Sequence, residues 1–385
     1  MNTKKPLSDY RDEFPITQKF IYLDHAGIAP VPLRVTKAVE NYLQESSHCG
    51  AFAYPNWQKK IDGVRNACAK LINAQPDEIA FVKNTSHGLS LVAGGIDWKR
   101  GDKVILYEKE FPANIYPWLN LKKKGVNINF IHSRHGEIRL EHIESLIDSQ
   151  TRLLAISSVQ FSNGFRIDLE KIGEICKAKG VLLCVDAIQS LGAIPMDVKK
   201  CHIDFLAADG HKWLFAPEGI GVFYCRHELA ENLNPPLIGW RSICNEFDFD
   251  RIAFRLKTSA LRFEEGSLNL MGVVALGAAL DLLFEVGINR IEQRVLTLGE
   301  LIIKKADKRG MIIKSPRTKD DRGGIVSITG TFDPAAVQSR LRELGIMVNV
   351  RDGALRISPH FYNTEAEIET LFGKLDAVGT STPRQ

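Results

Sequence analysis

Short apolar runs alternate with segments of helical periodicity between residues 79 and 224. This alternation is typical of parallel strands joined by crossover helices, and it limits the possible folds more than any other feature of the sequence. The run after Gly180 is nearly all apolar, as expected of a strand that is buried on both faces. The sequence therefore predicts an α/β domain. Its candidate strands are Ile79–Val82, Lys103–Tyr107, Asn127–Ile131, Leu153–Ser157, Val181–Val185, Phe205–Ala207 and Ile220–Tyr224.

The pattern changes after Pro235-Pro236. An irregular stretch reaches about residue 258, and it is followed by a long helical region and by a strand-rich and helical segment over residues 311–378. A chain of 385 residues is long enough for two domains. We therefore expect a large domain over residues 16–258. The small domain would combine the N-terminal arm, residues 1–15, with residues 259–385.

Charge and cysteine usage exclude several classes of protein. Lys and Arg total 50 against 46 Asp and Glu, and this balance is spread along the chain, so no nucleic-acid partner is expected. The seven cysteines contain no CxxC pair, which argues against a disulfide framework or a structural zinc site. The longest apolar stretch, Met271–Ile288, contains Asp281 and Glu285 and is typical of a buried helix. We expect a cytoplasmic protein without a metal or a membrane partner.

Three neighbouring segments carry a specific pattern. A strand leads into Val185-Asp186-Ala187-Ile188-Gln189, followed by DFLAADGHKW over residues 204–213 and PEGIG over residues 217–221. In these segments, the chain resembles the class V aminotransferase family of fold-type I enzymes, which use pyridoxal 5'-phosphate (PLP) and include cysteine desulfurases and isopenicillin N epimerase-like enzymes. The resemblance covers almost the whole chain. It implies a large domain with a mostly parallel seven-stranded sheet, a smaller α+β C-terminal domain, PLP as cofactor and an amino acid as substrate.

Two residues would carry the chemistry that this resemblance implies. Lys212 matches the lysine that holds PLP as a Schiff base, and Asp186 matches the acid that keeps the pyridine nitrogen protonated. Asp186 ends a predicted buried strand, where open α/β sheets bind ligands. Lys212 lies between two apolar runs, where partial desolvation lowers the pKa of an amine and makes it more nucleophilic. The alternatives are a turn aspartate and a surface lysine.

Further residues match the family's contacts with the cofactor. Thr85 and Ser86 open a predicted helix, whose N-terminus suits a phosphate, although the same residues also suit a simple helix cap. His211 matches a histidine that reaches the phosphate, while Asp209 stands where the family often has a serine. The other predicted cofactor residues are Phe111 against the ring, Gln160 beside the ring and Gln189 at the phenolic oxygen. A buried phenylalanine and a helix-face amide are the alternatives for Phe111 and Gln189.

The resemblance also assigns residues to the dimer and to the substrate. Ser267 matches a loop serine that donates to the phosphate across a homodimer interface, so a homodimer is expected. Arg356 matches the arginine that binds the substrate's α-carboxylate through its planar fork. Arg241, Arg262 and Arg351 are candidate helpers, but surface or interdomain ion pairs are the preferred interpretation for each.

One feature of the desulfurase pattern is missing. Cysteine desulfurases of this group carry a nucleophilic cysteine on a loop before the carboxylate arginine. Here only Ala354 and Leu355 separate Gly353 from Arg356, and no cysteine follows Cys244. We therefore expect no persulfide mechanism and favour a class V aminotransferase. An epimerase or racemase, a C–S lyase that acts by β-elimination, and a PLP-fold binding module without enzyme activity remain open alternatives.

Overall fold

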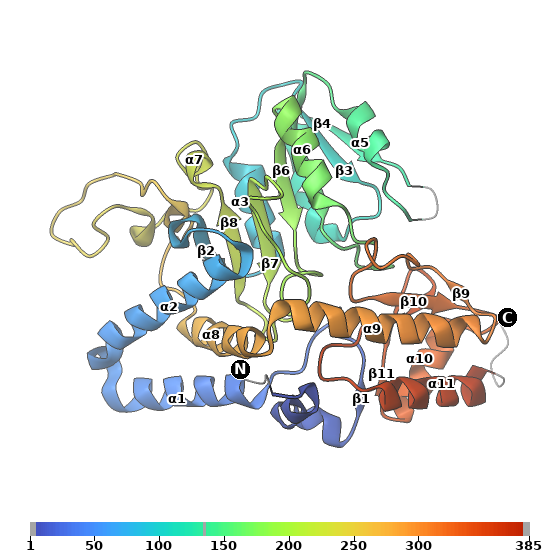
Figure 1. The fold of residues 1–385 in the computed structure, drawn as a ribbon. Coiled ribbons are helices and arrows are strands. Elements are labelled where there is room, and N and C mark those ends of the chain that lie inside the picture. The colour runs from blue at the N-terminus through green and yellow to red at the C-terminus, as the bar shows by residue number, and fades with distance from the viewer. Residues whose placement is uncertain (1–4, 134–135, 380–385) are drawn as a thin grey trace.

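The computed structural model describes residues 5–133 and 136–379. A sheet of seven strands lies at its centre in the order β2-β8-β7-β6-β5-β3-β4 (Figure 1). Only β8 runs antiparallel to its neighbours, β2 and β7, and all other pairs are parallel. The predicted mostly parallel seven-stranded sheet is confirmed, with strand ends shifted by two residues at most. The strands are β2 (Ile79–Val82), β3 (Lys103–Tyr107), β4 (Asn127–Ile131), β5 (Thr151–Ser157), β6 (Leu182–Asp186), β7 (Phe205–Asp209) and β8 (Gly221–Cys225).

Alternate residues of the central strands enter two separate apolar cores, one on each face of the sheet. In β3, Val104 and Leu106 belong to one core, whereas Ile105 and Tyr107 belong to the other. Helices α3 (Thr85–Gly95), α4 (Tyr116–Leu119) and α7 (His227–Ala230) contribute to the first core. Helices α5 (Leu140–Leu146) and α6 (Leu169–Lys179) contribute to the second. This double cover explains why the strands are apolar throughout.

Four long helices flank the sheet. They are α1 (Leu33–Cys49), α2 (Tyr54–Ile72), α8 (Leu270–Val286) and α9 (Ile288–Asp307). Helix α8 packs against α1 and α2, and Asp281 and Glu285 lie on its exposed side, so the predicted buried helix is present. Over residues 5–133 and 136–379, no single helix is long and apolar enough to cross a membrane. Only α8 and α9 together meet that test, and they are bent by 77° relative to each other.

A smaller antiparallel sheet is built from the C-terminal part of the chain, in the order β12-β13-β10-β9. Its strands are β9 (Ile312–Ile313), β10 (Val326–Thr329), β12 (Asn349–Arg351) and β13 (Ala354–Ile357). Helices α9, α10 (Pro334–Glu343) and α11 (Glu365–Gly379) share a third apolar core with this sheet. The predicted smaller α+β unit is therefore confirmed. Its division from the large domain at residues 15 and 258 stays a prediction.

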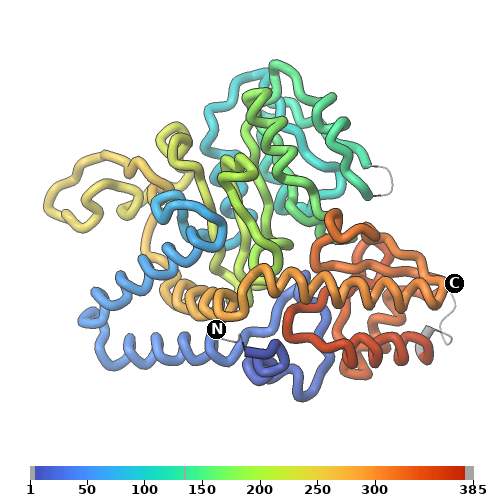
Figure 2. Tube along the Cα trace, viewed as in Figure 1, coloured from blue at the N-terminus to red at the C-terminus, as the bar shows by residue number. Residues whose placement is uncertain are grey.

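An early and a late segment of the chain lie side by side next to the central sheet, as Figure 2 shows for the blue and red parts. Strand β1 (Ile21–Tyr22) pairs in parallel with β11 (Ile346–Met347). Directly after β1, Asp24 forms an isolated bridge with Ser358. This pairing places residues 24–28 next to the end of β13, more than 300 residues further along the chain. Residues 1–4 of the predicted N-terminal arm lie outside the described residues.

A buried ion pair joins α2 to the segment that follows the short helix Ala260–Phe263, and it gives a stability prediction. Arg65 and Glu264 form two hydrogen bonds of 2.7 and 3.0 Å, and their side chains are only 5% and 1% exposed. Replacing Glu264 with alanine leaves the Arg65 charge buried without its partner, so we expect a loss of about 3–5 kcal/mol in the free energy of unfolding. Urea denaturation of both proteins measures this difference.

The matched control is Glu343, whose ion pair with Arg340 on α10 is exposed. Its replacement with alanine is expected to change the free energy of unfolding by less than about 1 kcal/mol. Equal effects of the two substitutions would contradict the structural role of the buried pair.

Candidate active site

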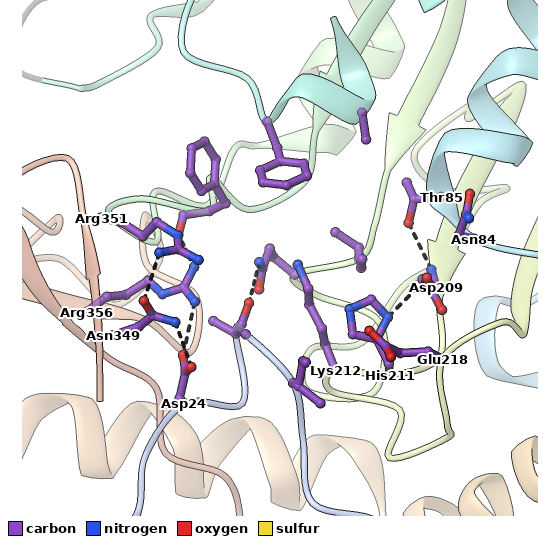
Figure 3. Close-up of a pocket in the computed structure, with 18 of the residues that line it drawn as sticks. Asp24, Asn84, Thr85, Asp209, His211, Lys212, Glu218, Asn349, Arg351 and Arg356 are labelled. Carbon is purple, nitrogen blue, oxygen red and sulfur yellow. Dashed lines mark hydrogen bonds and ion pairs between the residues drawn. The ribbon is translucent and has the colours of Figure 1, made fainter. Parts of the chain in front are cut away.

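A cavity of about 510 Å³ opens at the carboxyl ends of β6 and β7 and at the beginning of α3. It is lined by eight of the predicted site residues: Thr85, Ser86, Phe111, Asp186, Gln189, His211, Lys212 and Arg356. Figure 3 shows Lys212 reaching between two groups of polar side chains, with Thr85, Asp209 and His211 on one side and Arg356 on the other. The predicted residues therefore converge on one place although they come from distant parts of the sequence.

Lys212 is almost completely buried, with 9% of its surface exposed. Its Nζ lies 5.6 Å from the centre of the Phe111 ring. Burial lowers the pKa of the Lys212 amine, and the nearby Asp186 carboxylate opposes this effect. Desolvation was the expected consequence of the apolar runs around Lys212, and the surface-lysine alternative does not match this position. A larger share of neutral amine is the form that a nucleophile requires.

Asp186 is the last residue of β6 and is 1% exposed. Its Oδ1 accepts a hydrogen bond of 3.0 Å from the backbone N–H of Ile188, so it does stabilise the turn after the strand. Burial raises the pKa of Asp186, the carboxylate of Glu110 raises it further, and the Ile188 bond and Lys212 lower it. A cationic ring nitrogen beside this carboxylate would relieve the cost of burying it, which suits the predicted role.

The N-terminus of α3 forms one end of the cavity. Asn84 caps this helix by accepting from the backbone N–H of His87, and Thr85 and Ser86 are the first helical residues. The helix approaches β7 closely, because a Cβ on Gly88 would lie only 2.7 Å from the Cβ of Ala207. Free N–H groups and hydroxyls at a helix N-terminus are suitable donors for a phosphate. The predicted helix cap and the predicted phosphate site are thus the same structural element.

Asp209 is the departure from the family pattern at this end. Its backbone N–H donates to the hydroxyl of Thr85 at 3.0 Å. Its Oδ2 lies 3.1 Å from Nδ1 of His211, although not in hydrogen-bonding alignment, and its buried Oδ1 has no hydrogen-bond partner among the described residues. A buried acceptor without a donor is costly unless a further group completes the site. A phosphate cannot supply that donor, and the carboxylate of Asp209 would repel it. The hydroxyls, the helix N-terminus and the unpartnered Nδ1 of His211 are the groups that fit a bound phosphate.

The predicted ring contacts differ in how directly they reach the cavity. Phe111 is 41% exposed and lines the cavity, so it is not the buried phenylalanine of the alternative. Gln189 also lines it, while its amide donates to the carbonyl of Ala26 and accepts from Trp213 Nε1. Gln160 does not line the cavity; its amide donates to Glu110 at 3.0 Å. A role for Gln160 would therefore run through Glu110.

Ser267 lies outside this cavity, between the short helix Ala260–Phe263 and α8. Its predicted contact belongs to the cavity of a second chain and stays a prediction.

Arg356 lies in β13 with 2% of its surface exposed. It donates to the carbonyl of Phe161 at 2.9 Å and to Oδ1 of Asp24 at 3.1 Å. Burial lowers the pKa of this guanidinium, and Asp24 opposes the shift. A buried cation that faces the cavity suits the binding of a carboxylate.

The candidate helper arginines occupy different environments. Arg241 lies 3.8 Å from Glu246, as the ion-pair interpretation expected. Arg262 instead donates to the carbonyl of Ala230. Arg351 lines the cavity and donates to Asn349 and Val350, and within the described part of the chain it has no carboxylate partner. The ion-pair interpretation is therefore wrong for Arg262 and Arg351 over these residues.

Sequence reasoning missed Asp24, Glu110 and Asn349. Asp24 follows the apolar run Ile21–Leu23, so an acidic residue at a strand end was an available signal. The glycine at position 27 is required beside it, because a Cβ there would lie 2.4 Å from Asp24 Oδ2. No local signal pointed to Asn349, whose importance depends on a contact with Asp24 across 325 residues.

The connection before Arg356 is a tight hairpin. Arg351 of β12 pairs directly with Ala354 of β13, and the two turn residues between them, Asp352 and Gly353, have φ angles of 48° and 64°. This geometry belongs to a two-residue hairpin turn. Of the seven cysteines, none lines the cavity as far as the described residues extend. The site thus contains no protein thiol that would accept sulfur from a substrate.

A desolvated lysine near a buried acid, a helix N-terminus and a seven-stranded sheet are features that suit a PLP-dependent enzyme of fold-type I. The comparison with family models agrees: the chain belongs to the aminotransferase class V family, whose model matches residues 21–371. Members of this family use PLP as their cofactor.

Relatives extend over nearly the whole chain. A probable cysteine desulfurase of Pyrococcus abyssi is 34% identical, and the match covers 96% of each chain. An uncharacterized aminotransferase of Bacillus subtilis, YcbU, is 31% identical over 96% of this chain and 97% of its own length. Among solved structures, the apo cysteine desulfurase from Thermococcus onnurineus NA1 superposes with a TM-score of 0.90 at 30% identity, covering 99% of this chain and all of the other.

Proposed function

We propose that this chain is a PLP-dependent aminotransferase that acts on an amino acid through Lys212. The observation that supports it most is the position of Lys212 in one cavity between the N-terminus of α3, which would bind a phosphate, and Arg356, which would bind a carboxylate. An amino acid whose carboxylate meets Arg356 would bring its α-carbon towards the Nζ of Lys212. No other described lysine lines this cavity.

In this proposal, most of the cavity residues bind the cofactor, and one residue transfers the proton. PLP, when bound, withdraws electrons from the α-carbon of the substrate. Asp186 would hold the ring nitrogen in its protonated state, and Thr85, Ser86 and His211 would hold the phosphate. Phe111 would cover the ring and exclude water from it. The amine of Lys212 would remove the proton from the α-carbon of the substrate and deliver it to a carbon of the cofactor. Transamination requires this proton transfer.

A C–S lyase is the second candidate, because two of the relatives named above are called cysteine desulfurases or probable desulfurases. Elimination from a cysteine-like substrate also begins with proton removal by Lys212 and needs no thiol on the enzyme. A desulfurase that transfers sulfur to its own cysteine is disfavoured, because the tight turn at Asp352-Gly353 offers neither the thiol nor a long loop. Epimerisation and a role as a binding module stay alternatives.

We also propose a homodimer in the cytoplasm. Ser267 would then complete the phosphate site of the partner chain. All seven cysteines are free, which suits a reducing compartment.

The reaction type is tested by incubating the enzyme with a panel of amino acids and analysing the cofactor that it releases. With the correct amino donor we expect conversion of PLP to pyridoxamine phosphate. With L-cysteine we expect no protein-bound persulfide on any of the seven cysteines. A persulfide that forms at the rate of turnover would overturn the proposal, and pyruvate with sulfide but without pyridoxamine phosphate would establish the lyase instead.

A further inference from the structure

Two arginines, Arg351 and Arg356, lie at the end of the cavity where the substrate carboxylate would bind, which we call the substrate end. Only one of them has a carboxylate partner among the described residues. Arg356 lies 3.1 Å from the carboxylate of Asp24, so a side chain of the protein itself compensates it. Arg351 donates only to the side-chain oxygen of Asn349 and to the carbonyl of Val350 in the described part of the chain. Two cations therefore face a single anion, and one positive charge remains for a ligand.

Asn349 fixes this arrangement. Its amide nitrogen donates to Oδ2 of Asp24 at 2.8 Å, and its amide oxygen accepts from Arg351 at 2.8 Å. The aspartate and the free arginine are thus held by one side chain on β12, as the dashed lines in Figure 3 show. Because Asp24 is buried and bonded on both oxygens, it is a built-in part of the site and not a mobile surface charge.

No further described cation is available to a ligand at this end of the cavity. Lys314 is paired with Asp352 at 4.0 Å, and both line a neighbouring cavity. Lys212 faces Asp186, and His211 faces Asp209, so these groups belong to the cofactor end. Once the α-carboxylate has taken the charge of Arg351, a second carboxylate would find no uncompensated cation among the described residues at this end, because Asp24 compensates Arg356.

The cavity also has apolar lining near Asp24 and Arg356. It includes Tyr22, Ile28, Phe161 and Met347. The rings of Phe111 and Phe161 pack edge to face, with their centroids 5.2 Å apart. The hydroxyl of Tyr22 donates a hydrogen bond to the carbonyl of Ile28, so only the ring of Tyr22 is available to contact a substrate. Ile28 is 53% exposed, an apolar surface that a substrate side chain would cover.

We propose that the site selects amino acids with a single carboxylate and an uncharged, mainly apolar side chain, and that Asp24 is the residue that excludes a second carboxylate. The α-carboxylate takes the free charge of Arg351 together with the donors of Arg356. The side chain then lies against the apolar lining. This inference rests on the proposed function for the direction in which the substrate enters, but its charge argument concerns binding alone.

The test uses two ligands that cannot react because they lack an amino group. Pentanoate and glutarate have equal carbon number and differ by the second carboxylate. Titration of the holoenzyme by calorimetry should give a dissociation constant for glutarate that is at least about tenfold higher than that for pentanoate. The second carboxylate of glutarate would lose its hydration without gaining a cationic partner, which weakens binding. Equal or tighter binding of glutarate to the wild-type enzyme overturns the proposal without the use of any variant.

Three variants assign the effect to residues. Asp24→Asn keeps the shape and frees Arg356, so the preference for pentanoate should fall by about tenfold or more. Arg351→Gln should weaken pentanoate by about tenfold or more, since the uncompensated charge is removed. Asp168→Asn, at the N-terminus of α6 and outside this cavity, is the matched control and should leave both constants unchanged. Cofactor absorbance verifies that each variant still holds PLP.

The outcomes separate this inference from the proposed reaction. An unchanged preference in Asp24→Asn, with cofactor still bound, would refute the role of Asp24. Retained selectivity in an enzyme that forms no pyridoxamine phosphate with any amino acid would instead refute the aminotransferase and leave the selectivity standing.

Discussion

Replacement of Lys212 by alanine is expected to abolish turnover, with a loss of about 10⁴-fold or more, because no other described residue in the cavity offers an amine that accepts the α-proton. The fold should be retained. Burial disfavours the charged form of Lys212, so its removal relieves a desolvation cost in the cofactor-free protein. Steady-state kinetics with the amino acid found in the panel, together with circular dichroism, measure both effects.

The control for this variant is Lys171→Ala. Lys171 is exposed on α6, is paired with Asp168 and does not line the cavity. Its replacement should leave turnover unchanged. Turnover of Lys212→Ala within about tenfold of wild type would contradict the role of Lys212 as the proton carrier.

Replacement of Asp186 by asparagine has the second largest expected effect. The amide preserves the oxygen that accepts from Ile188, so the turn after β6 should persist. An amide cannot stabilise a protonated ring nitrogen, and we expect turnover to fall by about 10²–10³-fold while PLP still binds. Stopped-flow or steady-state rates, measured alongside cofactor content, separate the loss of rate from a loss of binding.

Asp168→Asn is a matched control for this change. Asp168 caps α6 by accepting from the backbone of Lys171, and asparagine is an equally good cap. Its turnover should remain that of the wild type. A near-normal rate for Asp186→Asn would rule out the proposed charge stabilisation.

The central sheet was predictable because each strand is an apolar run that is buried on both faces. The alternation of Ile105 and Val104 into two cores is a local property of the sequence. The direction of β8 was not predictable in the same way. A doubly covered strand has the same apolar pattern whichever way it runs, and only its pairing with β2 and β7 shows that it is antiparallel.

Some residues of the candidate site could be identified from short sequence motifs, whereas others depend on contacts between distant parts of the chain. The local sequence was sufficient to predict the roles of Lys212, Asp186 and the helix that begins at Thr85. The ion pair of Asp24 with Arg356 joins residues 332 positions apart, and it exists because β1 pairs with β11. No periodicity reports such a contact. The short connection at Gly353 lies between these cases, since its length was visible and its hairpin geometry was not.

The most direct test of this account is reduction of the purified holoenzyme with borohydride, followed by peptide mapping with mass spectrometry. Reduction fixes whichever lysine is covalently linked to PLP. The account predicts one modified peptide, which contains Gly210-His211-Lys212-Trp213 with the added mass on Lys212. Stoichiometric modification of a different lysine, or a holoenzyme with PLP bound and no lysine modified, would contradict it.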